Sequence, residues 1–157
     1  MINWSSINIT SSFGHKIHNL YLTHDPRVNR LTVLFPGAYN TCEAPLLHYA
    51  RLIALQAGSD TLGIEYGYNR SDHEFTSEMY KPSLDESLEA LRLCGIEKYH
   101  LINFISKSFG TLIAGEITRR LKPVNIRNLF LTPVGATIPY INESDCTVVF
   151  GTADSHL

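Results

Sequence analysis

Apolar and polar positions along this chain follow two different periods, and the change from one to the other predicts the elements. Seven short apolar runs rich in β-forming residues predict strands near 7–10, 17–23, 30–35, 61–66, 99–105, 126–132 and 146–150. From residue 30 onward, segments with the apolar spacing of helices separate these runs. We therefore expect strands and helices to alternate along most of the chain.

Three segments carry the signals of amphipathic helices. The segment between the third and fourth runs ends at Gly58, which is a typical helix terminator. In the next one, Ser83 and Glu86 have the spacing of a capping box, and Gly95 stops the helix. The last follows Ser108 directly, so a helix is expected to begin where the fifth strand ends.

Alternating strands and helices imply crossover connections and a mainly parallel sheet with helices on both faces. The first two runs have only a turn signal between them, at residues 11–14, so we expect an antiparallel hairpin at the sheet edge. The prediction is a three-layer α/β sandwich, formed as a single domain over 1–157, without a large cap. Ligands in such sheets bind where strands end and helices begin.

Composition and charge limit the partners. The net charge of −2 leaves no excess of Lys and Arg to neutralise phosphates, so we expect no nucleic acid and no membrane partner. The N-terminus lacks the pattern of a signal peptide, and no apolar run approaches the ~20 residues that span a bilayer, so a soluble, cytoplasmic protein is expected. Three widely spaced cysteines fit reduced thiols better than disulfides or a zinc site. A small molecule is the expected partner.

The segment Ser106-Lys107-Ser108-Phe109-Gly110 resembles the nucleophile elbow of the α/β-hydrolase family, G-x-S-x-G, with a strand before it and a helix after it. Ser106 replaces the first glycine of that motif, and serine is small enough for the close packing. The resemblance implies that Ser108 is a catalytic nucleophile. The alternative is that Ser108 only caps the following helix.

Residues 31–39, LTVLFPGAY, are similar to the strand and oxyanion loop of the same family. The resemblance implies that the backbone N–H groups of Ala38 and Phe109 bind the oxyanion, and that Tyr39 and Tyr66 line the substrate pocket. The alternatives are an ordinary Pro-Gly turn after a strand and aromatic residues that belong to the core.

Residues 146–154, CTVVFGTAD, resemble the family strand that ends on the triad acid, which implies that Asp154 orients the catalytic histidine. The alternative for Asp154 is a turn-forming residue. In that family the histidine follows a later strand, whereas this sequence stops at Leu157. We therefore expect the last strand, a helix and the general base to lie beyond it, with His73 and His156 as lesser candidates for the base.

The pattern taken together predicts a serine hydrolase that cleaves a carboxylic ester, thioester or amide through an acyl-enzyme on Ser108. A small-molecule acyl substrate is implied, with no cofactor and no metal, because neither an H-E-x-x-H motif nor a glycine-rich phosphate loop occurs. The competing hypothesis is a non-catalytic binding module of the same fold that lacks the base. A missing last strand would leave a parallel edge open to self-association.

Overall fold

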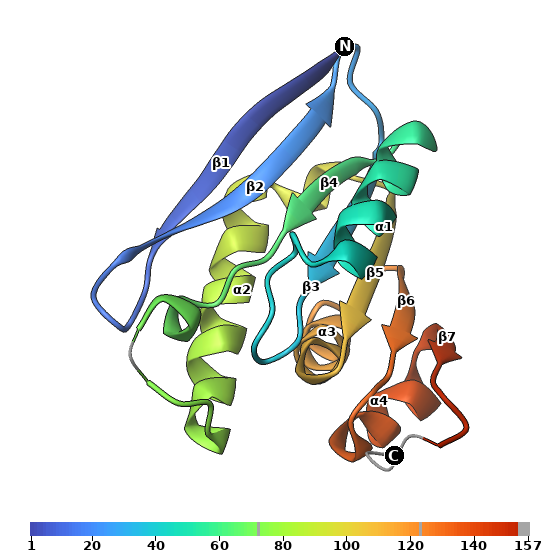
Figure 1. Ribbon diagram of the computed structural model, residues 1–157. Helices are drawn as coiled ribbons and strands as arrows, with labels where there is room; N and C mark the ends of the chain where they lie inside the picture. Colours follow the sequence, from blue (N-terminus) through green and yellow to red (C-terminus); the bar gives the residue numbers. More distant parts are fainter. Residues whose placement is uncertain (72, 123, 154–157) are drawn as a thin grey trace.

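A computed structural model describes residues 1–71, 73–122 and 124–153 of the chain. One seven-stranded sheet runs through the molecule in the order β1-β2-β4-β3-β5-β6-β7 (Figure 1). Its strands are β1 (Ile2–Thr10), β2 (Lys16–His24), β3 (Arg30–Phe35), β4 (Asp60–Gly63), β5 (Leu101–Lys107), β6 (Ile126–Leu131) and β7 (Asp145–Val149). The helices are α1 (Pro45–Gln56), α2 (Tyr80–Cys94), α3 (Phe109–Arg120) and α4 (Ile138–Glu143), and the 3₁₀ turns are η1 (Gly67–Arg70), η2 (Ser77–Met79), η3 (Ile96–Lys98) and η4 (Gly135–Thr137).

The pairing of the strands confirms the predicted sheet. β4, β3, β5, β6 and β7 pair in parallel, while β2 pairs antiparallel with both β1 and β4. The hairpin of β1 and β2 is paired along its whole length, from Ile2 opposite His24 to Thr10 opposite Lys16. The N-terminal antiparallel edge is therefore as expected.

Helices cover both faces of the sheet, as Figure 1 shows for α1 on one side and for α2 and α3 together on the other. Successive side chains of β3 point to opposite faces. Leu34 packs into a small cluster with Cys42 and Leu47 beneath α1, whereas Val33 and Phe35 belong to the main core beneath α2 and α3. Both faces of the central strands are buried, which explains their continuous apolar runs.

The predicted capping box at Ser83 and Glu86 is wrong. Helix α2 begins one turn earlier, at Tyr80, and Pro82 is accommodated in its first turn. Ser83 is buried inside the helix, where its carbonyl accepts a hydrogen bond from the Ser87 hydroxyl at 2.6 Å. The carboxylate of Glu86 is used elsewhere, as described below.

Three further features complete the description of the fold. The stretch between β6 and β7 holds only η4 and the six-residue helix α4, so nothing in it forms a large cap over the sheet edge. The three cysteines are free thiols, and Cys42 and Cys94 are buried. In the ranges that the structure describes, no helix is long and apolar enough to cross a bilayer.

Candidate active site

Ser108 lies between β5 and α3 in a backbone conformation that side-chain-bearing residues rarely adopt, with φ 50° and ψ −121°. Its position is that of an N-cap, but its hydroxyl makes no capping hydrogen bond to the helix. The carbonyl of Ser108 instead accepts hydrogen bonds from the N–H and the hydroxyl of Thr111, at 2.9 and 2.6 Å. The half-buried hydroxyl is therefore left at the sheet edge, and helix capping does not explain the residue.

Gly110 lets the helix start this close to the sheet. A Cβ atom at this position would lie 2.5 Å from the carbonyl oxygens of both Phe35 and Pro36. These are backbone atoms that cannot rotate away. Ser106, at the other small position of the motif, is fully buried and is paired with Phe35 across β5 and β3. The sequence spacing of small residues around Ser108 thus has a direct packing cause.

The loop after β3, residues 36–40, passes directly beside the serine. A Cβ on Gly37 would lie 3.6 Å from the Cβ of Ser108. The Asn40 N–H donates to the Gly37 carbonyl at 3.2 Å, and this fixes the peptide plane so that the N–H of Ala38 points the opposite way. Across the described residues, neither this N–H nor that of Phe109 donates a hydrogen bond. Ala38 and Phe109, which line the same cavity as Ser108, thus each have a backbone donor without an acceptor in the described ranges.

Three side chains around η1 hold this loop by its carbonyl groups. The Tyr66 hydroxyl donates to the Pro36 carbonyl at 3.1 Å, and the Tyr68 hydroxyl donates to that of Ala38 at 2.7 Å. The side-chain amide of Asn69 adds a hydrogen bond of 3.2 Å to the Asn40 carbonyl. Burial raises the pKa of both tyrosines, so both remain protonated donors at neutral pH. Three carbonyls of one five-residue loop are therefore fixed from a single segment.

Tyr66 supports the loop from below. It is only 1 % exposed, and it lies under the loop and against Phe109, with the two ring centroids 5.6 Å apart. It is not among the residues around the cavity, whereas Tyr39 is at its rim and largely exposed. The supporting roles of Tyr68 and Asn69 had no signal in the sequence beyond the cluster of polar and aromatic residues after the fourth strand.

Glu86 on α2 anchors the segment that carries these supports. Its buried carboxylate accepts hydrogen bonds from the Gly67 N–H at 2.9 Å and from the Ser11 hydroxyl at 2.7 Å. Ser11 belongs to the turn of the N-terminal hairpin. One carboxylate therefore ties together the hairpin, the long helix and the start of η1.

A cavity of about 600 Å³ opens above Ser108. Its lining residues are mostly apolar or aromatic: Gly37, Ala38, Tyr39, Asn40, Phe75, Ser77, Tyr80, Lys107, Ser108, Phe109, Leu112 and Val134. Phe75 packs edge to face on Phe109, with the centroids 4.8 Å apart, and on Tyr39 at 5.9 Å. A cavity of this size with few polar groups is typical of sites for small apolar ligands.

The predicted acid and base fall in or near a part of the chain that is not described. Asp154 and His156 both lie outside the described residues. The last paired residues of β5, β6 and β7 are Lys107, Leu131 and Val149, so the chain leaves β7 at the same sheet edge as Ser108. His73 packs against Phe13, with the ring centroids 5.4 Å apart, and no histidine of the described ranges lines the cavity.

The comparisons with known proteins agree on the fold. No family model and no curated protein sequence matches the chain. Among solved structures, the esterase Pf2001 of Pyrococcus furiosus superposes with a TM-score of 0.65 at 16% identity, over 84% of this chain and 53% of the esterase. ATU1826 of Agrobacterium tumefaciens, a protein of unknown function, gives a TM-score of 0.71 at 12% identity, over 92% and 68%.

The 2-hydroxy-6-oxo-6-phenylhexa-2,4-dienoate hydrolase of Rhodococcus sp. gives a TM-score of 0.59 at 15% identity, over 86% of this chain and 48% of that enzyme. The chain thus spans about half the length of the esterase and of this hydrolase. At these identities the similarity establishes the architecture, and the chain has the α/β-hydrolase fold.

Proposed function

We propose that this chain of α/β-hydrolase fold is a serine hydrolase that cleaves a carboxylic ester, with thioesters and amides as related substrates. The observation that carries the proposal is the position of Ser108. Its uncapped hydroxyl lies at the start of a helix, in a strained backbone conformation, beside a loop in which the Ala38 N–H has no acceptor among the described residues. Strained backbone of this kind is concentrated at functional sites.

In the proposed reaction, Ser108 Oγ attacks the carbonyl carbon of the ester while its proton passes to a general base. The carbonyl oxygen becomes an oxyanion, which accepts hydrogen bonds from the N–H groups of Ala38 and Phe109 and is favoured by the positive end of the α3 dipole. The C–O bond to the alcohol then breaks, and the alcohol leaves with the proton. Water releases the acid from the acyl-enzyme and restores the serine.

We propose Asp154 as the group that orients the base, because the chain leaves β7 at the same end of the sheet as Ser108. The base would be a histidine that follows residue 153, either His156 or one beyond Leu157. The substrate class follows from the cavity, whose lining is mostly aromatic and aliphatic and favours an apolar acyl group. Tyr39 at the rim would contact the substrate, whereas Tyr66 would act through the loop.

Labelling with a fluorophosphonate probe, followed by mapping of the modified peptide, tests the nucleophile. We expect slow labelling confined to Ser108, and its loss in Ser108→Ala. Ser77→Ala is the matched control, because Ser77 also lines the cavity but lies on η2. Labelling that survives in Ser108→Ala, or that Ser77→Ala removes, would contradict the proposal.

The second candidate is a binding module of the same fold without catalysis. It is favoured by the histidines of the described residues, none of which lines the cavity. The same experiment separates the two functions if binding of an apolar ester analogue is measured beside it. Saturable binding with neither labelling nor ester turnover would favour the module. Turnover that depends on Ser108 would favour the enzyme.

A further inference from the structure

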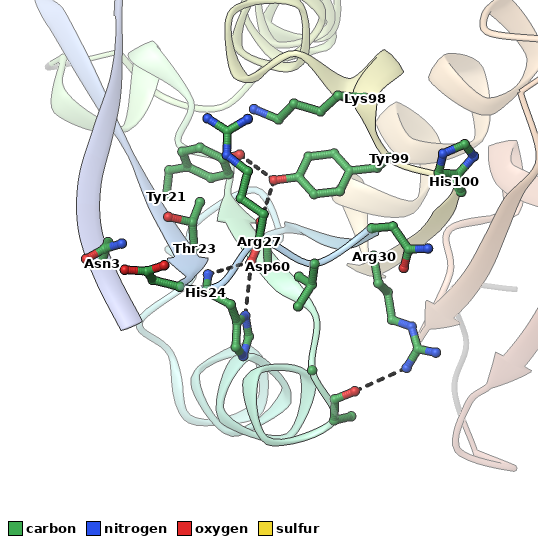
Figure 2. Close-up of a pocket in the computed structure, with 15 residues that line it drawn as sticks. Asn3, Tyr21, Thr23, His24, Arg27, Arg30, Asp60, Lys98, Tyr99 and His100 are labelled. Atoms are coloured by element: carbon green, nitrogen blue, oxygen red, sulfur yellow. Dashed lines mark hydrogen bonds and ion pairs between the residues drawn. The ribbon is translucent and has the colours of Figure 1, made fainter. Parts of the chain in front are cut away.

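A second cavity lies at the opposite end of the sheet from Ser108 (Figure 2). It has a volume of about 860 Å³ and is formed where β2 ends and where β3 and β4 begin. Since β5 runs from this end of the sheet to Ser108, about 20 Å of strand separates the two cavities. None of the functional residues considered above lines it.

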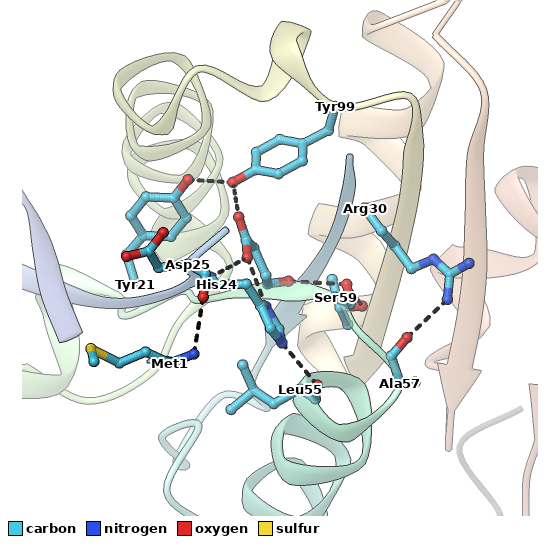
Figure 3. Close-up of polar contacts among 11 residues, drawn as sticks. Met1, Tyr21, His24, Asp25, Arg30, Leu55, Ala57, Ser59 and Tyr99 are labelled. Carbon is cyan, nitrogen blue, oxygen red and sulfur yellow. Dashed lines mark hydrogen bonds and ion pairs between the residues drawn. The ribbon is translucent and has the colours of Figure 1, made fainter. Parts of the chain in front are cut away.

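The floor of this cavity is a buried and fully connected polar network (Figure 3). The carboxylate of Asp60, 3 % exposed, accepts hydrogen bonds from the Tyr99 hydroxyl at 2.6 Å and from the His24 backbone N–H at 2.8 Å. The Tyr21 hydroxyl in turn contacts that of Tyr99. Burial and the hydrogen bond to Asp60 raise the pKa of Tyr99, so its hydroxyl stays a donor.

The side chain of His24 completes this network. Its two ring nitrogens lie 3.0 Å from Asp60 Oδ1 and 3.1 Å from the carbonyl oxygen of Leu55. Both partners are oxygen atoms that accept hydrogen bonds. Both carboxylate oxygens of Asp60 therefore have partners in the network, His24 at Oδ1 and Tyr99 at Oδ2.

The walls of the cavity carry more positive than negative charge. Arg27, Arg30 and Lys98 line it, and the exposed carboxylate among its lining residues is that of Asp25. In the described ranges, none of the three cations forms an ion pair with a carboxylate. This local excess contrasts with the net charge of −2 of the whole chain.

Two of these cations are directed at the same part of the cavity. The ammonium of Lys98 lies over the rings of Tyr21 and Tyr99, 5.6 and 5.4 Å from their centroids. Figure 2 shows the guanidinium of Arg27 and this ammonium pointing toward one another above the tyrosines. Arg30 is held apart by its hydrogen bond of 3.2 Å to the Ala57 carbonyl. Like charges in this arrangement repel each other, and an anion between them relieves the repulsion.

We infer that this cavity binds a phosphate monoester of a small hydroxylated molecule. A guanidinium and an ammonium together match the charge and the acceptor oxygens of a phosphate dianion. The cavity is larger than a phosphate group, and its remaining lining includes the neutral polar side chains of Asn3, Thr23 and Asn29, which suit hydroxyl groups. The volume is within the range of sites for small organic ligands.

The test is isothermal titration of the chain with glucose 6-phosphate, inorganic phosphate and glucose at constant ionic strength. We expect one site for glucose 6-phosphate, weaker binding of inorganic phosphate at the same site, and no binding of glucose. Arg27→Ala and Lys98→Ala should each weaken glucose 6-phosphate binding about tenfold, as expected for the loss of one charge-assisted contact. Both residues are exposed, so neither change endangers the fold.

Lys16→Ala is the matched control. It removes one exposed positive charge at the other end of β2, about 26 Å away along the strand, and should leave binding unchanged. Ser108→Ala should also leave it unchanged, so failure of this site and failure of the proposed hydrolase activity are separate results. Absence of saturable binding, or equal weakening by Lys16→Ala, would overturn the inference. Cosedimentation with phosphatidic acid vesicles that is lost in Arg27→Ala would overturn the soluble ligand in favour of a lipid.

Discussion

The conformation of Ser108 makes a prediction about stability that does not depend on catalysis. At φ 50° and ψ −121°, any residue with a Cβ atom is strained by roughly 1–3 kcal/mol, and only glycine escapes this cost. At ordinary positions the order is reversed, since glycine is less stable than alanine by about 0.5–1 kcal/mol. The difference between the two effects predicts that Ser108→Gly is more stable than Ser108→Ala by about 1 kcal/mol.

Urea unfolding followed by far-UV circular dichroism measures this difference, which corresponds to about 2–4 °C in melting temperature for a chain of this size. The control pair is Ser6→Gly and Ser6→Ala, at an exposed position in the middle of β1, where the alanine variant should be the more stable one. The hydroxyl of Ser108 makes no capping hydrogen bond, so its own loss contributes little. If Ser108→Gly is no more stable than Ser108→Ala, the backbone at this position is not strained and the reasoning fails.

Four more outcomes follow from the described contacts. Gly110→Ala should lower the free energy of unfolding by at least ~2 kcal/mol, because the new Cβ meets two backbone carbonyls at 2.5 Å, and unchanged stability would contradict this close approach. Tyr68→Phe removes one hydrogen bond from the loop of residues 36–40 and, if that loop binds the oxyanion as proposed, should slow phosphonylation of Ser108 about tenfold while ligand affinity is kept, whereas a loss of affinity alone would point to a substrate contact. Burial raises the pKa of Glu65, so Glu65→Gln should stabilise the protein at pH 8. This gain in stability should vanish as the pH falls below the ordinary pKa of glutamate, because the carboxyl is then protonated in both the folded and the unfolded state. Urea unfolding midpoints across pH 4–8 measure the gain. Burial also raises the pKa of the Cys94 thiol to about 12, so iodoacetamide at pH 8 should modify the more accessible Cys146 first, as read by mass spectrometry.

The sequence predicted the sheet well because its strands and helices are separated by strong local signals. The hairpin, the helices that follow the third and fifth strands, and the end of α2 at Gly95 follow from apolar periodicity and terminators. Gly110 could be assigned as a close-packing position because the motif around Ser108 combines a strand end, a small residue and a helix start. Such features depend on residues close together in the chain.

The supports of the site could not be predicted in this way. Tyr68 is thirty positions from the carbonyl that it holds, and Glu86 is seventy-five positions from Ser11, so no local pattern links them. Ser83 and Glu86 have the spacing of a capping box, but both residues are buried within helix α2. A glutamate that satisfies distant backbone and hydroxyl donors is indistinguishable in sequence from one that caps its own helix. The network of Asp60 and His24 is equally non-local.

The strand order has a consequence for how the site forms during folding. β3 and β5 are neighbours in the sheet, but α1, β4 and α2 lie between them in the chain. The loop with Ala38 is therefore synthesised long before Ser108, and closing this long loop is slow compared with forming the local hairpin of β1 and β2. A nascent chain that ends after β4 already contains the hairpin and the loop of residues 36–40, yet this loop has neither Phe109 nor Gly110 to pack against. The site forms only when β3 pairs with β5. The geometry around Ser108 is therefore complete only after the central part of the chain has folded.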